Sequence, residues 1–419
     1  MKRTWKFIAD YSLLLISGAA LALAWANISP HSYHEIIDGI LLKDSIIGYQ
    51  KGGEGSGRVL TFHYLINDVL MAFFFAVAGK EVWEAIALKD GSLRGRKAFT
   101  PLFATAGGMF GPIAVYLGLA LILGSETYSA VANGWAIPTA TDIAFSYLVG
   151  RLIFGRRHPA VAFLLLLAIA DDAAGLIILA VFYPSGDLQP EWLLLPVAAT
   201  GAVYLLFNWL PRHLDRSNPN GGRSASTFVE RNFLALPYAV GGALCWYGFQ
   251  ESGLHPALGL LPIIAAIPHS DHDYGIFVHA EPKRLDMLNR IEHNLEKPVE
   301  VILFFFGLAN AGVVFSAFGT PTVLVLLGLI VGKPVGIFLF GWLAAGPLQL
   351  GMPKGMNLSD IVIVGFIAAI GFTVSLFIAS VAFDPGPVQD AAKMGALLSL
   401  FAAVFAFIVA RFFPVEKVD

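Results

Sequence analysis

The sequence is poor in cysteine and in charge. It contains one cysteine, Cys245, and 14% charged residues, whereas ordinary soluble domains contain about 25%. A single cysteine cannot form an internal disulfide, so we expect Cys245 to fill the protein core. The net charge of −3 gives no indication of a nucleic-acid partner. No grouping of histidine and cysteine indicates a transition metal, and no cofactor is expected.

Long polar blocks are also missing, and apolar residues dominate. Hydrophobic residues make up 57% of the chain, and the mean hydropathy is +0.70. We therefore predict an all-α polytopic membrane protein, with one integral domain over residues 1–419 and about twelve transmembrane helices. The predicted helices cover residues 11–27, 60–87, 99–123, 134–150, 159–183, 190–211, 233–249, 254–268, 295–317, 320–346, 358–383 and 389–411.

Two features near the amino terminus complete this arrangement. The first apolar run follows a basic start and ends in Ala24-Trp25-Ala26, so it is either a first membrane helix or a cleaved signal peptide. The helix is the preferred interpretation because a bundle follows. The segment 28–59 is polar and rich in glycine, and we predict an extracytoplasmic loop or hairpin there.

Most of the 27 Lys and Arg residues fall in alternate loops of the predicted bundle. Lys2, Arg3 and Lys6 begin this series, and Arg156 and Arg157 belong to a later loop on the same side. Because cytoplasmic segments carry the excess of Lys and Arg, both termini are predicted to be cytoplasmic.

Two adjacent carboxylates, Asp171 and Asp172, lie in the middle of the apolar run 161–180. A 20-residue helix is about 30 Å long, so both acids would lie near the middle of a bilayer. Each costs about 2.5 to 3.5 kcal/mol at that depth, which indicates a functional site. At about 6 Å they would repel each other by roughly 3 kcal/mol, and a small cation binding between them would expel a proton. The alternative is a pair that only caps or crosslinks helices.

Two predicted membrane segments contain residues that interrupt a helix. Pro138, Thr141 and Asp142 lie in the first, where proline frees backbone polar groups at membrane depth. The alternative is a kinked helix whose carbonyls are satisfied by threonines. Glycine and hydroxyl residues at 371–380 mark the second, although such residues also serve as packing faces. Paired interruptions in the two halves of a chain are typical of a transporter built from inverted repeats.

Lys333 lies inside the apolar run 328–336 and is followed by Pro334. A buried ammonium group needs an anion, and Asp171 and Asp172 are the candidates. The alternative is a lysine that extends to the membrane interface.

Together these motifs resemble the NhaA family of sodium/proton antiporters. The similar stretches run through nearly the whole chain, at residues 66–74, 134–145, 168–172, 252–255, 308–312, 332–334 and 371–373. NhaA is itself a known example of inverted repeats with broken helices. That architecture, with two broken helices crossing near the membrane midplane, is therefore implied by the resemblance.

The resemblance also implies roles for single residues. Asp171 and Asp172 match the paired aspartates that bind Na⁺, Thr141 and Asp142 match the unwound segment, and Lys333 matches the buried lysine. The residues that match positions tied to the pH response are Glu81, Glu292, His255 and His293. One departure affects the pH response, because Glu296 and Lys297 replace a second family histidine before Pro298.

The expected function is secondary antiport of Na⁺ or Li⁺ against H⁺ across the bacterial inner membrane. Exchange is expected to be electrogenic and pH-dependent, to serve sodium and pH homeostasis, and to involve no enzymatic reaction. Carboxylate and hydroxyl oxygens suit a small, hard cation. The alternatives are an intramembrane aspartyl protease, for which Asp142 and Asp172 would supply the two acids, and a sodium-coupled solute symporter. A homodimer formed through the segment 28–59 is also expected from the resemblance.

Overall fold

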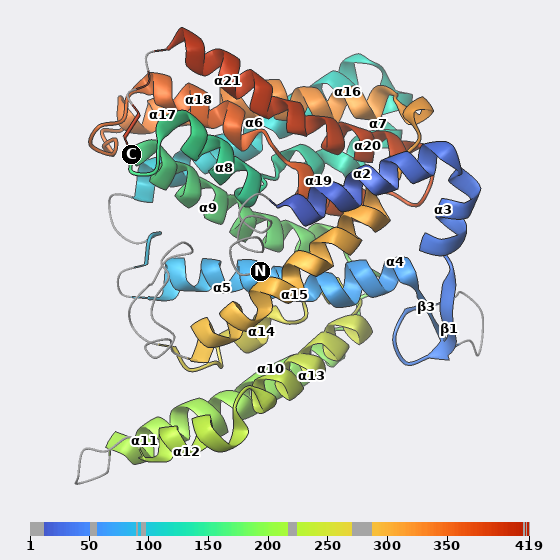
Figure 1. Ribbon diagram of the computed structural model, residues 1–419, viewed down its shortest axis with the longest axis vertical. Coiled ribbons are helices and arrows are strands. Elements are labelled where there is room, and N and C mark those ends of the chain that lie inside the picture. The colour runs from blue at the N-terminus through green and yellow to red at the C-terminus, as the bar shows by residue number, and fades with distance from the viewer. Residues whose placement is uncertain are drawn as a thin grey trace. The chain divides into compact units, whose positions relative to one another are not determined.

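The structure is a computed structural model that describes residues 12–50, 57–88, 91–93, 98–216, 224–269, 287–413, 415 and 417–418. Three basic residues of the predicted cytoplasmic amino terminus, Lys2, Arg3 and Lys6, and positions 51–56 of the predicted hairpin lie outside the described residues. The described chain is mostly helical with one small sheet (Figure 1). It forms two compact units. Unit 1 comprises 1–40, 92–178 and 303–419, and unit 2 comprises 41–91 and 179–302.

Six helical segments of the described chain are long and apolar enough to cross a membrane. They are Phe62–Ala87, Phe99–Ile122, Pro159–Phe182, Pro190–Arg216, Thr320–Ala345 and Pro387–Phe412. The helices Leu358–Ala368 and Phe372–Ala382 form a seventh segment if they are counted as one span bent by 50°. The protein is therefore a membrane protein of mainly helical structure.

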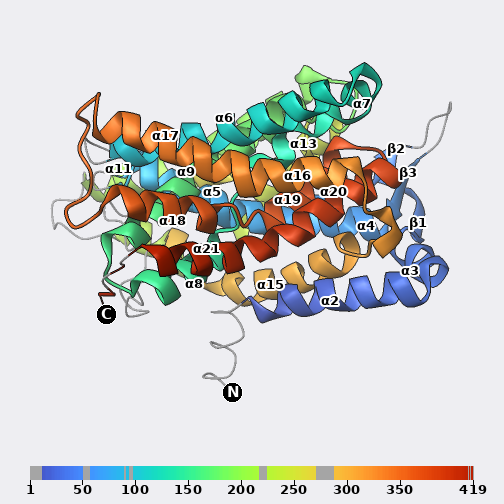
Figure 2. The same cartoon turned by 90° about the horizontal axis from the view of Figure 1, so that it is seen from above.

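Unit 1 is a bundle of apolar helices (Figure 2). Its helices are α2 (Leu13–Ile28), α3 (Pro30–Ile37), α6 (Phe99–Ile122), α7 (Ser125–Val131), α8 (Ile143–Phe154), most of α9 (Pro159–Phe182), the end of α15 (Met287–Asn310), α16 (Thr320–Leu327), α17 (Lys333–Ala345), α18 (Leu358–Ala368), α19 (Phe372–Ala382), α20 (Pro387–Leu398) and α21 (Ala402–Phe412). The 3-10 helices of this unit are η3 (Ala132–Thr139), η8 (Phe315–Ala317) and η10 (Ser399–Phe401), and η9 (Gly328–Gly332) is a π-helix.

Helices α6 and α17 pack closely because glycines line their contact. A side chain on Gly107 would collide with the backbone of Gly336, and one on Gly111 would collide with the backbone of Gly332. Small residues four apart let membrane helices approach to backbone contact. These two glycine pairs therefore set the distance between α6 and the start of α17.

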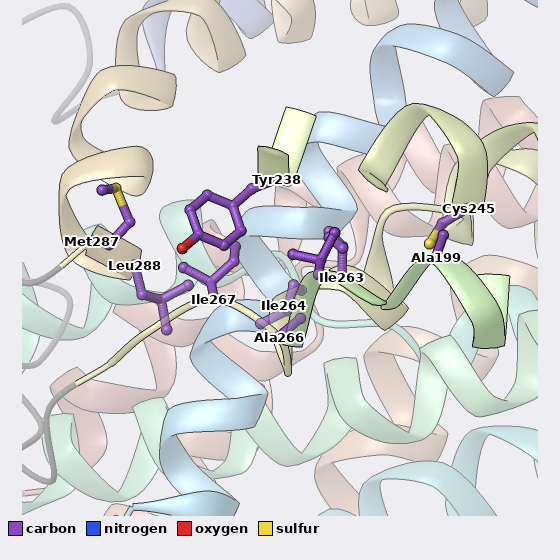
Figure 3. Close-up of a cluster of buried hydrophobic side chains, with 10 residues drawn as sticks. Ala199, Tyr238, Cys245, Ile263, Ile264, Ala266, Ile267, Met287 and Leu288 are labelled. Atoms are coloured by element: carbon purple, nitrogen blue, oxygen red, sulfur yellow. The ribbon is translucent and has the colours of Figure 1, made fainter. Parts of the chain in front are cut away.

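Unit 2 contains the remaining helices and the sheet. Its α-helices are α4 (Phe62–Tyr64), α5 (Met71–Ala87), α10 (Leu194–Val203), α11 (Leu210–Arg216), α12 (Ser224–Phe233), α13 (Leu236–Ser252), α14 (Leu261–Ile264) and the start of α15. The π-helices η1 (Leu65–Leu70) and η5 (Tyr204–Trp209) and the short 3-10 helices η4 (Pro190–Leu193) and η6 (Pro256–Leu258) complete the list. Figure 3 shows its core, where Cys245 and Tyr238 of α13 lie among buried aliphatic side chains. The expectation that Cys245 fills the core is confirmed, because it is fully buried.

The segment 28–59 contains α3 and most of a three-stranded sheet in the order β1-β3-β2. The strands are β1 (Ile40–Ser45), β2 (Tyr49–Gln50) and β3 (Arg58–Thr61). Strands β2 and β3 are antiparallel, with Tyr49 opposite Val59. The chain is therefore not purely α-helical as predicted. A small sheet forms in the segment where the apolar helical pattern is lost.

Two predicted helices differ from the structure. The prediction of one helix over 254–268 is wrong, because only the turn η6 and the four-residue α14 form there. Pro256 and Pro262 lack amide donors and prevent a continuous helix. The helix predicted over 295–317 begins earlier and ends at Asn310, beyond which residues 311–314 are not helical.

Candidate functional site

The first predicted interruption is present in unit 1. The 3-10 helix η3 contains Pro138 and ends at Thr139, and α8 begins at Ile143. Between them, Ala140 has an extended backbone conformation. Proline cannot donate an amide hydrogen bond, so a regular helix does not continue through this stretch.

The second interruption separates α18 from α19 at residues 369–371. Hydrogen bonds join the two interruptions directly. The Asp142 amide donates to the Ile370 carbonyl at 2.7 Å, and the Thr141 hydroxyl donates to the Ala368 carbonyl at 3.1 Å. The Ser375 hydroxyl donates to the Ile137 carbonyl at 2.7 Å. Backbone groups freed in one broken helix are thus satisfied by the other.

The Asp142 carboxylate caps two helices at once. Its Oδ1 accepts from the Phe145 amide of α8 at 3.2 Å, and its Oδ2 accepts from the Thr373 amide of α19 at 3.2 Å and from the Thr373 hydroxyl. Helix amino termini carry partial positive charge, which a carboxylate neutralises. Asp142 is 4% exposed, so these caps compensate for its burial.

Lys333 begins α17 beside the glycine contact with α6. It is fully buried, and a side chain on Gly108 would lie 3.7 Å from its Cε atom. Its Nζ lies 2.9 Å from Asp171 Oδ2 and donates to the Thr139 carbonyl at 2.5 Å. The lysine therefore does not extend to an interface, and it joins α9 to the carboxyl end of η3.

Asp171 accepts two strong hydrogen bonds at one oxygen. Its Oδ2 receives the Thr141 hydroxyl at 2.6 Å and the Lys333 ammonium group. Its Oδ1 is buried and has no hydrogen-bond partner among the residues that the structure describes. A buried carboxylate oxygen of this kind is the acceptor that a cation or a proton would need.

Asp172 lies on the neighbouring face of α9 and is partly buried. It is close enough to Lys333 to interact with it electrostatically. The structure thus brings together Asp171, Thr141 and Lys333, with Asp172 nearby. Asp142 and Thr373 join the same two interruptions through their own hydrogen bonds.

The four residues predicted for the pH response all lie in unit 2. Glu292 Oε2 lies 2.7 Å from Lys80 Nζ, which also lies 2.6 Å from Glu84 Oε2. His255 Nδ1 lies 3.7 Å from Asp68 Oδ1.

His293 is exposed and lies 3.3 Å from Glu296, and Glu81 is partly buried. The printed contacts thus pair Glu292 with Lys80, His255 with Asp68, and His293 with Glu296.

Sequence reasoning assigned no role to two residues that the structure places at these sites. Thr373 contacts Asp142 from 231 positions along the chain, and Lys80 contacts two carboxylates. For Lys80 a signal existed, since a lysine four residues before Glu84 within an apolar helix needs an anion. For Thr373 the only signal was its place after the glycine of the second interruption.

A membrane protein in which two interrupted helices satisfy each other's backbone, beside a buried lysine–aspartate pair, belongs to the class of secondary ion transporters. Residues 4–410 match the family described as Na+/H+ antiporter 1, and the chain belongs to that family. It is a Na⁺/H⁺ antiporter and not an enzyme, so the protease and symporter alternatives are excluded.

Two named relatives match this chain over its full length. The Na(+)/H(+) antiporter NhaA of Jannaschia sp. (strain CCS1) is 63% identical over 420 residues, which are 100% of this chain and 99% of that protein. The Na(+)/H(+) antiporter NhaA of Desulfitobacterium hafniense (strain DSM 10664 / DCB-2) is 42% identical over 423 residues, 100% and 98% respectively. A solved structure of the sodium proton antiporter MjNhaP1 from Methanocaldococcus jannaschii has a TM-score of 0.49 and 14% identity, and covers 96% of this chain and 91% of that chain.

Proposed function

We propose that Asp171 and Asp172 bind the transported Na⁺ and carry the exchanged protons. The observation that supports this most directly is the Oδ1 atom of Asp171, a buried acceptor without a hydrogen-bond partner in the described part of the chain. Na⁺ is a hard cation that binds oxygen, and Asp172 follows on the same helix at about 100°. Bound Na⁺ would displace the protons from the two carboxylates.

Thr141, Asp142 and Lys333 have supporting roles in this proposal. Thr141 orients Asp171 through its hydroxyl group, and Asp142 stabilises the two helix ends that face the interruption. Lys333 neutralises the Asp171 carboxylate when neither a proton nor Na⁺ is bound to it. Release of two protons, one from each carboxylate, for each Na⁺ bound would make exchange electrogenic. Li⁺ is smaller and equally hard, so the same oxygens would accept it, and no cofactor is involved.

The test is proton movement in everted membrane vesicles on addition of Na⁺ or Li⁺. We expect Asp172→Asn and Asp171→Asn to abolish exchange, because the amide cannot release a proton or neutralise a cation. Asp187→Asn, which removes an exposed acid outside the site, should exchange normally. Na⁺-driven proton movement retained by Asp172→Asn at normal protein amount would overturn the assignment.

We further propose twelve membrane crossings arranged as inverted repeats, with the interrupted helices crossing near the midplane of a bacterial inner membrane. The hydrogen bonds between the two interruptions support this arrangement. Both termini would then be cytoplasmic and the 28–59 segment extracytoplasmic. Single cysteines introduced at positions 43 and 216 in a Cys245→Ser background should be labelled from opposite sides. Labelling from the same side would refute the orientation.

A role of this antiporter in sodium and pH homeostasis requires a pH response, for which we propose Glu81, Glu292, His255 and His293. The contact of Glu292 with Lys80 supports this, since protonation of Glu292 would weaken it.

We also propose a homodimer through the 28–59 segment, because its sheet contains exposed strand β1. Deletion of residues 51–57 should lower the dimer fraction in detergent, and an unchanged fraction would exclude that interface.

A further inference from the structure

Unit 2 contains a long cleft beside α10, which we call the α10 cleft. Its volume is about 930 Å³, within the range of pockets that bind small molecules. One wall is a single face of the membrane span Pro190–Arg216 (Figure 1), whose lining residues recur every three or four positions from Leu193 to Arg212. That stretch of helix is about 28 Å long, close to the thickness of the hydrocarbon layer of a membrane.

The α10 cleft opens on the outer surface of the membrane span. Val197 and Tyr204 both line the cleft, yet they are 70% and 43% exposed. Gly201 lies between them in the lining, and a side chain built on it would meet no atom within 4 Å. Because exposed side chains of a membrane span face lipid, an acyl chain can enter the cleft from the side.

Polar side chains gather at one end of the α10 cleft. Asn208 and Arg212 end the helical wall, and Trp83 of α5 and His269 lie opposite. The Arg212 Nη2 atom donates to the His269 carbonyl at 2.9 Å, and the His269 and Trp83 rings pack edge to face with their centroids 6.1 Å apart. The end near Leu193 is lined by apolar residues. The cleft therefore has the polarity of an amphiphile, with one polar end and a long apolar part.

The polar end offers donors to an anion. The Trp83 Nε1 atom is buried and has no hydrogen-bond partner among the residues that the structure describes, which is unfavourable for an N–H group. Arg212 is partly buried and is the lining residue with a permanent charge, and the described lining contains no acid. A guanidinium group binds a phosphate through two parallel hydrogen bonds. This end of the cleft therefore suits a phosphate group.

We propose that the α10 cleft binds an acidic phospholipid of the bilayer, with its phosphate group at Arg212 and Trp83 and an acyl chain along α10. One leaflet of the hydrocarbon layer is about 15 Å thick, so a chain that starts at Arg212 reaches about to Gly201. A zwitterionic lipid fits less well, because Arg212 repels its ammonium group and no lining carboxylate binds it. The residues of the proposed ion site lie in unit 1, so the lipid site is separate from them.

The test is native mass spectrometry of delipidated full-length protein in detergent, titrated with phosphatidylglycerol or with phosphatidylcholine of the same acyl chains. We expect one phosphatidylglycerol per chain, bound at least about tenfold more tightly than phosphatidylcholine, because its phosphate bonds with a charged group. Arg212→Gln should remove this preference. Arg216→Gln is the matched control, since it removes an exposed arginine one helical turn further along that does not line the cleft.

The acyl chain and the Trp83 donor are tested separately. Gly201→Leu fills the path of the chain without striking a neighbour, and should weaken phosphatidylglycerol binding about tenfold. Gly118→Leu on α6 is its control, because a side chain there also meets no atom within 4 Å, and it should bind normally. Trp83→Phe should weaken binding about threefold to tenfold. If Arg212→Gln does not fold, Gly201→Leu still tests the site.

Glycerol phosphate, the headgroup without chains, should not displace the bound lipid. Displacement would show a site for free anions and overturn the proposal. Equal binding of the two lipids to the wild-type protein, or phosphatidylglycerol binding that neither Arg212→Gln nor Gly201→Leu weakens, would also overturn it. A lower dimer fraction in Gly201→Leu with unchanged lipid binding would show that a second copy of the chain fills the cleft, and the lipid site would fail.

Discussion

The buried contact between Lys333 and Asp171 is expected to couple these two residues strongly in stability. The perturbation is a double-mutant cycle with Asp171→Asn, Lys333→Met and the combined variant. Each single substitution removes one charge and leaves the other buried without its partner. The combined variant removes both charges, so it should be less destabilised than the sum of the single variants predicts.

Burial sets the magnitude of this coupling. The Lys333 and Asp171 side chains are 0% and 1% exposed at an N–O distance of 2.9 Å. Breaking a buried pair by removing one partner costs about 3 to 5 kcal/mol. Arg290 and Glu230 lie at a similar distance, 2.7 Å, but their side chains are 40% and 46% exposed. Pairs of that kind contribute about 0.2 to 1 kcal/mol, because water screens them.

The assay is the free energy of unfolding in mixed detergent micelles for both cycles, which does not depend on transport. We expect a coupling energy of at least about 2 kcal/mol for Lys333 and Asp171, and less than about 1 kcal/mol for Arg290 and Glu230. Equal coupling in the two cycles, or additive single effects at Lys333 and Asp171, would refute the argument that burial makes this pair strong.

Three further predictions concern packing, capping and pH. Gly107→Ala should destabilise the protein by about 1 to 3 kcal/mol, because the new methyl group meets the Gly336 backbone; Gly118→Ala on the same helix, where nothing lies within 4 Å, should be neutral or stabilising in the same unfolding measurement. Asp142→Ala removes caps from two helices and should cost roughly twice as much as Thr61→Ala, which removes one cap; equal costs would contradict the double cap. Finally, the proposed site has Na⁺ and protons competing for Asp171 and Asp172, so acid pH should lower the apparent Na⁺ affinity while saturating Na⁺ restores one maximal rate. A maximal rate that falls with pH at saturating Na⁺ would instead indicate a separate sensor, such as Glu292 with Lys80.

The sequence by itself determined the class of protein and the residue types of the candidate site. Pro138 and the adjacent aspartates interrupt apolar runs of membrane length. The polar groups that they place in the bilayer are unfavourable there unless they find partners. The same argument required an anion for Lys333 and limited the candidates to Asp171 and Asp172. These conclusions depend on composition and depth, which can be read without coordinates.

Only the tertiary structure decided which groups meet. Neighbouring residues on a helix point about 100° apart, so the choice of Asp171 over Asp172 as the direct partner of Lys333 depends on how α9 is rotated against α17. The contact between Asp142 and Thr373 joins helices far apart in sequence, and no local pattern encodes it. The glycines of α6 and α17 allow those helices to approach closely. Their small volume has this effect only because the tertiary structure brings the two helices together.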